Sequence, residues 1–316
     1  MESLQNIKRR LKSVHNINQI TKAMELVAAT KMRKSQEIAL ASRPYALAAL
    51  DLLAKLSETE QSAASPLLQK RKVKRTAVVL VTSDKGLAGS FNSSVIRAFE
   101  KVLREKNTNI SKENDCFVAV GQKAAMYLEK NITLSQKFVR FGDHATIEQI
   151  KPLADHLING YAKNEWDRVL VFSTHFKTAL RQVVLMRQIL PVEIESLKAT
   201  AKEIVPETGR FSELVKENGV SFFNGKSELA SEYLLEPSSA TIIQELVPHL
   251  VLMQIYHLIL ETNASEHATR RVAMKSASDN ASELADNLTL VYNKSRQAGI
   301  TRELIEITAS AEALGA

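Results

Sequence analysis

Apolar residues recur at helical spacing near both ends of this chain, in stretches far longer than an ordinary helix. Residues 249–298 form a run of fifty residues without glycine or proline, in which Leu284, Leu288 and Val291 are four and three positions apart. Average helices in globular proteins have about 11–12 residues, whereas a continuous helix over this run would measure about 75 Å. A helix of that length extends beyond a domain of this size, so it needs a partner along its side.

The N-terminal end of the chain supplies a matching stretch. Residues 1–43 also lack glycine and proline, and their apolar positions step by three and four, as in a coiled coil, at Leu4, Ile7, Leu11 and Val14. Small residues keep the C-terminal stretch slim, at Ala264, Ala268, Ala273, Ala277 and Ala281. We predict that residues 1–57 and 239–316 form two long helices, paired as an antiparallel coiled coil and joined through a globular insert.

The middle of the chain has the pattern of an α/β domain. Short continuous apolar runs, such as AVVLV after Thr76, are typical of strands buried on both faces of a parallel sheet. Strands are predicted from Thr76 and over residues 116–121, 137–141, 167–174 and 181–190, with helices over residues 93–106, 122–130 and 147–162. The fold class is therefore α/β, with a parallel-rich, Rossmann-like domain over residues 76–236 inserted between the two helices of the coiled coil. Residues 203–229 are predicted to be a loop-rich excursion from it.

Positive charge is concentrated in the N-terminal helix. The whole chain carries a formal charge of +7, and residues 1–43 alone contain nine basic and three acidic side chains. Residues 249–316 contain six basic and eight acidic side chains, so the two predicted helices attract one another weakly. A basic face remains on the N-terminal helix, which indicates an acidic partner.

Cysteine usage and hydropathy exclude several classes of protein. Cys116 is the only cysteine, which excludes an internal disulfide framework, a cysteine-rich zinc site and a redox dithiol. The longest apolar run, residues 250–260, is interrupted by Gln254 and His257 and is short for a bilayer, so we expect no membrane-spanning segment. The first residues do not have the pattern of a signal or transit peptide.

The chain offers little evidence of catalytic chemistry. The sequence SDKGLAGSFN over residues 83–92 lies between a strand and a helix, where α/β folds bind phosphate, but it matches neither GxGxxG nor GxxxxGK[ST]. A tight turn whose glycines serve packing is the favoured interpretation. The seven histidines show no ligand spacing with carboxylates, and GxSxG and HExxH motifs are absent from the sequence, so we expect no cofactor, metal or catalytic site.

Two further segments leave alternatives open. Five basic residues over residues 70–75 could bind nucleic acid, but no aromatic residues interleave with them, so a solvated linker is favoured. The apolar positions within residues 300–314 fit either a helix that folds back on its own domain or an apolar end seated in a partner's sleeve.

Both ends of the chain resemble the gamma subunit of the F-type ATP synthase. The resemblance lies in ITKAMELVAATKMRKSQ over residues 20–36, in SRPYA after it, and in SEHATRRVAMKSASDNASEL and LTLVYNKSRQAGITRELIEI near the other end. The turn SDKGLAGSFN also fits the family. The resemblance implies a non-catalytic central rotor shaft, whose coiled coil lies inside a ring of three alpha and three beta subunits. The α/β domain would be the foot, standing with the epsilon subunit on the c-ring that proton or sodium flow turns.

The resemblance also implies partner contacts for individual residues and a location. The contacts to the beta subunits fall on Lys22, Met24, Lys31, Arg33, Arg296 and Gln297. Glu266 and Arg270 belong to the transmission region, and Tyr233 and Glu236 to the contact with the c-ring and the epsilon subunit. The expected location is the cytoplasmic face of a bacterial plasma membrane, as a peripheral protein within the delta-linked complex as a whole.

Without the resemblance, other interpretations of the same residues remain. Met24 would be a coiled-coil residue, and Arg270 and Arg296 solvated helix charges. The alternative function is a nucleotide-binding α/β enzyme with a helical dimerisation arm. A third hypothesis is a coiled-coil adaptor for nucleic acid that uses the basic helix.

Overall fold

The computed structural model describes residues 3–57, 65–105, 110–142, 145–193 and 236–314, with side chains described except at 42–57 and 312–314. The predicted excursion over residues 203–229 and Tyr233 therefore lie outside the described residues. The elements in chain order are α1 Leu4–Ser57, the short 3-10 helix η2 Pro66–Leu68, β1 Thr76–Val81, α2 Phe91–Arg104, β2 Cys116–Val120, α3 Gln122–Asn131, β3 Leu134–Phe138, α4 Ile147–Ala162, β4 Arg168–Phe176, β5 Gln182–Leu190 and α7 Ser239–Leu314.

The chain divides into two compact units, each of which includes part of both long helices. The first unit consists of Met1–Ala28 and Arg270–Ala316, and the second of Ala29–Thr269. The first contains the helix pair alone, and the second contains the sheet together with the adjoining parts of α1 and α7. We refer to them below as the helix-pair unit and the α/β unit.

The α/β unit contains one five-stranded sheet in the order β3-β2-β1-β4-β5. β1 pairs in parallel with β2 and with β4, and β2 pairs in parallel with β3. β5 is antiparallel to β4, from which a short turn separates it, as expected of a hairpin at the edge of a sheet. The predicted parallel-rich, Rossmann-like sheet is confirmed, since the order 3-2-1-4-5 follows that of a Rossmann sheet, in which the strand order reverses between β1 and β4.

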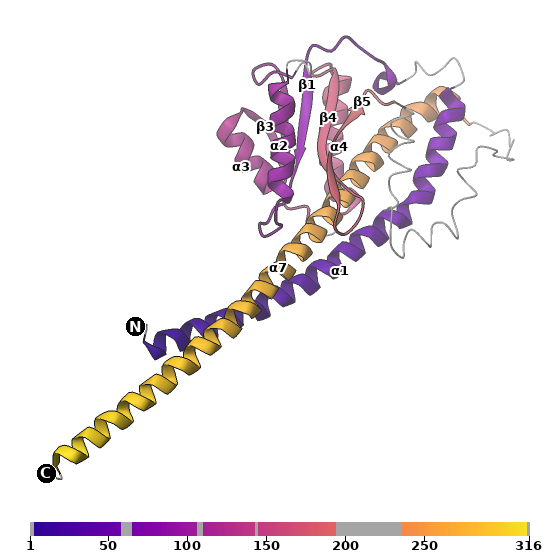
Figure 1. Cartoon of the computed structure of the whole chain (residues 1–316). Coiled ribbons are helices and arrows are strands. Elements are labelled where there is room, and N and C mark those ends of the chain that lie inside the picture. The colour runs from indigo at the N-terminus through magenta and orange to yellow at the C-terminus, as the bar shows by residue number, and fades with distance from the viewer. Residues whose placement is uncertain (1–2, 58–64, 106–109, 143–144, 194–235, 315–316) are drawn as a thin grey trace. The chain divides into compact units, whose positions relative to one another are not determined.

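β1 illustrates why the strands are continuous apolar runs. Its residues alternate between two cores: Ala77, Val79 and Val81 belong to one, and Val78 and Leu80 to the other. The first core includes buried residues of α4 and of the early part of α7, and the second includes residues of α2 and α3. Figure 1 shows these helices on the two faces of the sheet. A strand covered on both faces has no polar side to alternate with.

Two predicted boundaries are shifted. β3 begins at Leu134 and ends at Phe138, whereas the sequence pattern predicted a strand over residues 137–141. β3 is an edge strand with three exposed central residues, so it lacks the apolar run that identified the other strands. Helix α2 begins at Phe91 and ends at Arg104, so both of its ends lie two residues before those of the predicted range 93–106. The earlier start places Phe91, a buried residue, in the first turn of the helix.

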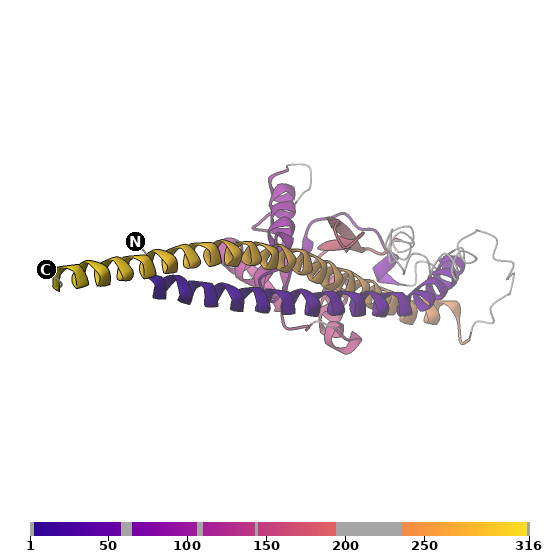
Figure 2. The ribbon, with the colours of Figure 1, turned by 60° about the horizontal axis from the view of Figure 1, so that its bottom comes forward.

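In the helix-pair unit, α1 and α7 pack along a narrow seam, and both Figure 1 and Figure 2 show them side by side. On α1 the seam has Ile7, Thr21 and Ala28 buried, with residues 4, 11, 14, 18 and 25 half-buried between them. The matching buried positions on α7 are Met274, Ser278, Ala281, Ala285 and Leu288. Steps of three and four on both helices are the pattern of a coiled coil. The two chain ends pack together as predicted.

Burial along α7 changes in three stages. Every residue from Met253 to Thr262 is buried, the residues after Arg270 are buried only along the seam, and every residue from Ile300 to Ala311 is exposed. In the described chain α7 is the one helix long and apolar enough to cross a membrane by length and composition, with a window of mean hydropathy 1.3 that is 61% buried. Packing against the sheet therefore accounts for most of that apolar surface.

Candidate functional site

The helix-pair unit exposes large apolar side chains outside its seam. On α1 they are Ile17, Ile20, Leu26 and Val27, each between 49% and 65% exposed. On α7 they include Leu284, Leu290 and Val291, with Leu290 69% exposed. A folded helix pair that leaves this many large apolar side chains exposed to solvent is typical of a protein that binds a partner at that surface.

The C-terminal end of α7 is the most exposed part of the unit. From Ile300 to Ala311 every residue is exposed, and Figures 1 and 2 show this end continuing past the first turns of α1. Ile300, Leu304, Ile305 and Ile307 are 49% to 65% exposed. α7 stays one helix as far as Leu314, so the fold-back alternative does not hold over these residues. We call residues 300–311 the apolar tip.

The residues predicted to contact beta subunits are distributed over both units. In the helix-pair unit, Lys22, Arg296 and Gln297 are exposed, whereas Met24 is half-buried. In the α/β unit, Arg33 is exposed and Lys31 is half-buried. Arg33 forms an ion pair with Glu37 one turn later, at 2.9 Å between Nε and Oε1, and its side chain remains 67% exposed. The structure thus leaves most of these basic groups available on the surface.

The two residues predicted for the transmission region differ in burial. Arg270 is 8% exposed and lies in the helix-pair unit, and Glu266 is half-buried in the α/β unit. Arg270 is therefore not the solvated helix charge that its sequence alone suggests. Of the predicted foot contacts, Glu236 is exposed, and Tyr233 lies outside the described residues.

The polar groups of the turn after β1 form hydrogen bonds with other groups of the protein. The Ser83 backbone N–H and hydroxyl both donate to Asn92 Oδ1 at 3.0 Å, and the Ser83 hydroxyl also lies 2.6 Å from the Lys85 carbonyl oxygen. Asp84 accepts hydrogen bonds from the backbone N–H groups of Gln122 and Arg140, each at 3.0 Å. These contacts hold the turn against the start of α3 and the end of β3.

The N-terminus of α3 is likewise filled by protein groups. The Ala124 N–H donates to Thr82 Oγ1 at 2.7 Å, and the Lys123 N–H donates to the Ser83 carbonyl oxygen at 3.1 Å. Together with Asp84 on Gln122, three amides that could bind a phosphate already have acceptors. Gly121 completes the close approach, with φ +89° and an ideal Cβ only 2.2 Å from the Thr82 carbonyl oxygen. This geometry favours the tight-turn interpretation over a phosphate site.

The basic segment over residues 70–75 is more engaged than a solvated linker. Arg71 stacks over the ring of Tyr161 at 4.2 Å from the ring centroid, and its guanidinium donates to the Tyr161 carbonyl oxygen at 3.0 Å. Lys70 forms an ion pair with Glu193 at 2.9 Å. The backbone N–H groups of Lys74 and Arg75 donate to Asp167. The segment is therefore fastened to the end of α4, to the residue before β4 and to Glu193 after β5. Within the described residues, no group of three histidine, cysteine or acidic side chains is placed to hold a metal ion.

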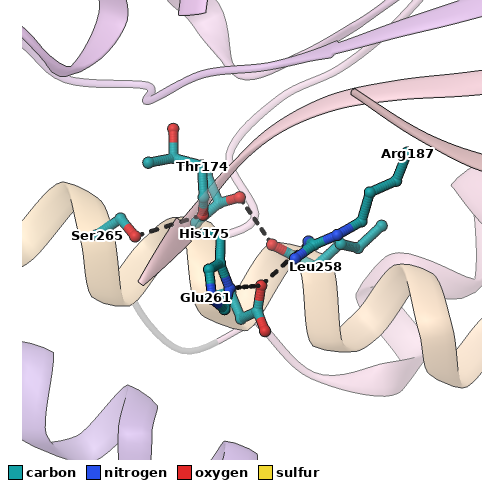
Figure 3. A network of polar contacts seen from close by, with 7 residues as sticks. Thr174, His175, Arg187, Leu258, Glu261 and Ser265 are labelled. Atoms are coloured by element: carbon teal, nitrogen blue, oxygen red, sulfur yellow. Dashed lines mark hydrogen bonds and ion pairs between the residues drawn. The ribbon is translucent and has the colours of Figure 1, made fainter. Parts of the chain in front are cut away.

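Sequence reasoning missed a buried ionic cluster between the sheet and α7, shown in Figure 3. Glu261 Oε2 lies 3.1 Å from His175 Nδ1 and 3.2 Å from Arg187 Nη1, and the three side chains are 7%, 8% and 10% exposed. His257, one turn before Glu261, is 2% exposed and not a boundary residue, and burial lowers its pKa to about 4. The sequence carries one signal for this cluster: Gln254 and His257 interrupt the apolar run over residues 250–260. From the sequence alone, these two polar residues serve only as evidence against a membrane-spanning segment.

Comparisons with known proteins agree along the whole chain. The family model described as ATP synthase matches residues 3–314. The ATP synthase gamma chain of Geobacter sp. (strain M21) is 35% identical over 99% of this chain and 99% of its own, and that of Trichlorobacter lovleyi is 36% identical with the same coverage. A chain of the Euglena gracilis mitochondrial ATP synthase, solved as OSCP/F1/c-ring, has the same fold, with a TM-score of 0.63, 18% identity and coverage of 98% of this chain and 94% of its own.

Proposed function

The chain belongs to the ATP synthase gamma chain family and is a non-catalytic central-stalk rotor subunit of an F-type ATP synthase, and we propose that its helix-pair unit is the shaft gripped by the alpha and beta subunits of the catalytic ring. The observation that carries the proposal is the apolar tip. Four large aliphatic side chains there are about half or more exposed in the chain alone. A sleeve of partner subunits would remove that surface from water.

The basic side chains support a second part of the proposal. Lys22, Lys31 and Arg33 lie on α1 in a stretch with nine basic and three acidic residues, and would face an acidic lever segment of the beta subunits. Met24 lies near them in the sequence and is half-buried. Arg296 and Gln297 are exposed, and would contact a catch loop of a beta subunit. Glu266 and Arg270 would connect these contacts within the transmission region.

The unequal faces of the helix pair provide a mechanism. A shaft that presents apolar, basic and polar sides, placed on the axis of a threefold ring, cannot make the same contacts with each surrounding subunit. Rotation of the shaft changes those contacts, and the affinity of each catalytic site can shift only by the free-energy difference between them. Torque and nucleotide affinity are therefore reciprocally linked, with the reaction itself taking place on other subunits.

The α/β unit is proposed as the foot of the shaft. Glu236, and Tyr233 outside the described residues, would contact the c-ring and the epsilon subunit. The assembled chain would then be a peripheral protein on the cytoplasmic face of a bacterial plasma membrane, within the delta-linked complex as a whole.

The test is mass spectrometry of an affinity pull-down from detergent-solubilised membranes with the tagged chain as bait. We expect alpha and beta ATPase subunits in threefold molar excess over this chain, together with the epsilon subunit and the c subunit. A variant in which Leu304 and Ile305 are changed to asparagine is the matched bait, and it should recover less alpha and beta while keeping the foot partners. Recovery of the wild-type chain with a soluble metabolic enzyme alone would contradict the proposal.

Two binding measurements separate the alternatives. If the chain is a nucleotide-binding enzyme, the isolated chain should bind NAD or ATP with micromolar affinity. If it is a rotor shaft, we expect no such binding, because the polar groups of the turn at Ser83 and Asp84 already form hydrogen bonds within the protein. A nucleic-acid adaptor predicts an affinity for DNA or RNA that falls steeply with salt concentration.

A further inference from the structure

The contact between α7 and the edge hairpin of the sheet is polar, whereas large aliphatic residues make up the core that the early part of α7 shares with the sheet. Three α7 residues spaced four apart reach the hairpin β4–β5: Glu261, Ser265 and Thr269. Residues at that spacing lie on one face of a helix. All three belong to the α/β unit, as do their partners.

Each of the three residues contacts a different point of the hairpin. Glu261 binds His175 of β4 and Arg187 of β5 through the same carboxylate oxygen. The Ser265 hydroxyl donates to the Thr174 carbonyl oxygen at 3.3 Å. The Thr269 hydroxyl lies 3.4 Å from Gln182 Oε1 and donates to the Ser265 carbonyl oxygen of its own helix at 2.9 Å. Figure 3 shows His175 and Arg187 converging on Glu261 from the two strands.

A buried ionic cluster contributes little net stability to the packing of a helix, compared with apolar residues of similar size. A buried ion pair loses hydration that its Coulomb attraction only partly restores, so hydrophobic residues of similar size often replace such pairs with equal or greater stability. Glu261 also keeps its other carboxylate oxygen, Oε1, buried without a hydrogen-bond partner among the described residues. Retaining a buried charge beside the apolar core of the sheet calls for a reason other than stability.

Directionality is that reason. Val247, Leu250, Val251 and Leu258 pack α7 into the apolar core of the sheet, but apolar contact is non-directional and changes little when a helix turns or slides slightly. Hydrogen bonds and ion pairs weaken steeply with distance and angle, so the contacts of Glu261 with two different strands, together with that of Ser265 one turn later, fix the rotation and register of α7 on the sheet. A rotor shaft needs that property because torque tends to turn α7 relative to the unit that holds it.

We infer that Glu261, held by Arg187 and His175, is a positioning residue that locks α7 against rotation on the sheet, so that torque passes between the helix and the α/β unit. This inference rests on the proposed function. It assigns to the cluster a mechanical role in coupling, separate from the surfaces that contact the ring.

The test uses the complete ATP synthase containing this chain, reconstituted in lipid vesicles, and compares proton pumping with ATP hydrolysis. The variant combines Glu261→Leu with Arg187→Leu and His175→Leu, so that no member of the cluster stays buried without its partner. We expect assembly and hydrolysis to stay within about twofold of wild type and proton pumping per ATP hydrolysed to fall about fivefold, since the coupling and not the catalytic sites is changed. Urea unfolding of the isolated chain should show unchanged or greater stability.

The matched control removes an exposed ion pair of the same unit. Glu129→Leu with Lys137→Leu breaks a contact of 2.9 Å between side chains that are 46% and 54% exposed, away from α7. Pumping per ATP should be unchanged in it.

Wild-type pumping per ATP in the variant with leucine at positions 175, 187 and 261 would overturn the inference. If that variant does not assemble, Glu261→Gln alone decides: it keeps the shape of the side chain, and full coupling in it would also overturn the inference. A wild-type complex that hydrolyses ATP without pumping would instead count against the proposed function itself.

Discussion

Gly121 connects β2 to α3 at a position where no other residue fits. Its φ of +89° lies in the region that side chains rarely adopt, and an added Cβ would lie 2.2 Å from the Thr82 carbonyl oxygen and 2.8 Å from its carbon. We predict that Gly121→Ala lowers the free energy of unfolding of the isolated chain by roughly 2–4 kcal/mol, from backbone strain and overpacking together. Gly86→Ala is the control, because nothing lies within 4 Å of its ideal Cβ. Urea unfolding of both variants measures the difference, and equal stability would contradict the prediction.

His257 makes the stability of the α/β unit sensitive to acid. Burial lowers its pKa from 6.5 to about 4, although the charge of Glu261 acts in the opposite direction. The folded state therefore binds a proton at His257 more weakly than the unfolded chain, so stability is complete above pH 6.5 and falls as the pH drops toward 4. By pH 4.5 the loss is on the order of 2–3 kcal/mol. His257→Gln should remove this part of the pH dependence, as measured by urea unfolding at pH 7 and pH 4.5. The same slope in both proteins would exclude His257 as its source.

At the scale of elements, the seam between α1 and α7 depends on small side chains. Ala28 is 1% exposed in α1, whereas Ala23 on the same helix is exposed. A leucine at position 28 has no space unless the helices separate, so Ala28→Leu should destabilise the isolated chain by about 1–3 kcal/mol. Ala23→Leu should change stability by less than about 0.5 kcal/mol, as is usual at the surface. Thermal unfolding followed by circular dichroism compares the two. A larger effect at position 23 would mean that the seam lies elsewhere.

The apolar tip is expected to contribute to partner binding and not to the stability of the isolated chain. Leu304 is 57% and Ile305 61% exposed, so changing both to asparagine should leave the stability of the isolated chain unchanged within about 0.5 kcal/mol. Binding to the ring of alpha and beta subunits should weaken by roughly tenfold or more, because burying each side chain contributes on the order of 1 kcal/mol. Titration of the labelled chain against the isolated ring measures this, and undiminished affinity would remove the tip from the interface.

At the scale of the whole molecule, most of the architecture could be predicted because it follows from local patterns. The two-faced burial of Val78 and Val79 appears in the sequence as an unbroken apolar run, and the seam residues of α1 appear as steps of three and four. β3 was shifted because an edge strand lacks that signal. The cluster around Glu261 could not be predicted, since His175 is 86 positions away in the sequence and only the packing of α7 on β4 brings them together.

Three basic residues of α1, Lys22, Lys31 and Arg33, are expected to act in coupling through their positive charge. Reversing Lys22, Lys31 and Arg33 together to glutamate changes the charge of α1 without removing a buried seam residue, and it replaces the ion pair between Arg33 and Glu37 by a like-charge contact. Assembly should therefore be weakened less than coupling, because the apolar tip still contributes to binding while the contacts that differ between rotational states are lost. We expect proton pumping per ATP hydrolysed to fall by about threefold or more, with a smaller decrease in the amount of assembled complex. The control reverses Lys72, Lys74 and Lys112, three exposed lysines of the α/β unit, which equals the change in net charge. Equal pumping per ATP in the two triple variants would mean that net charge, and not the position of these residues on α1, sets the coupling.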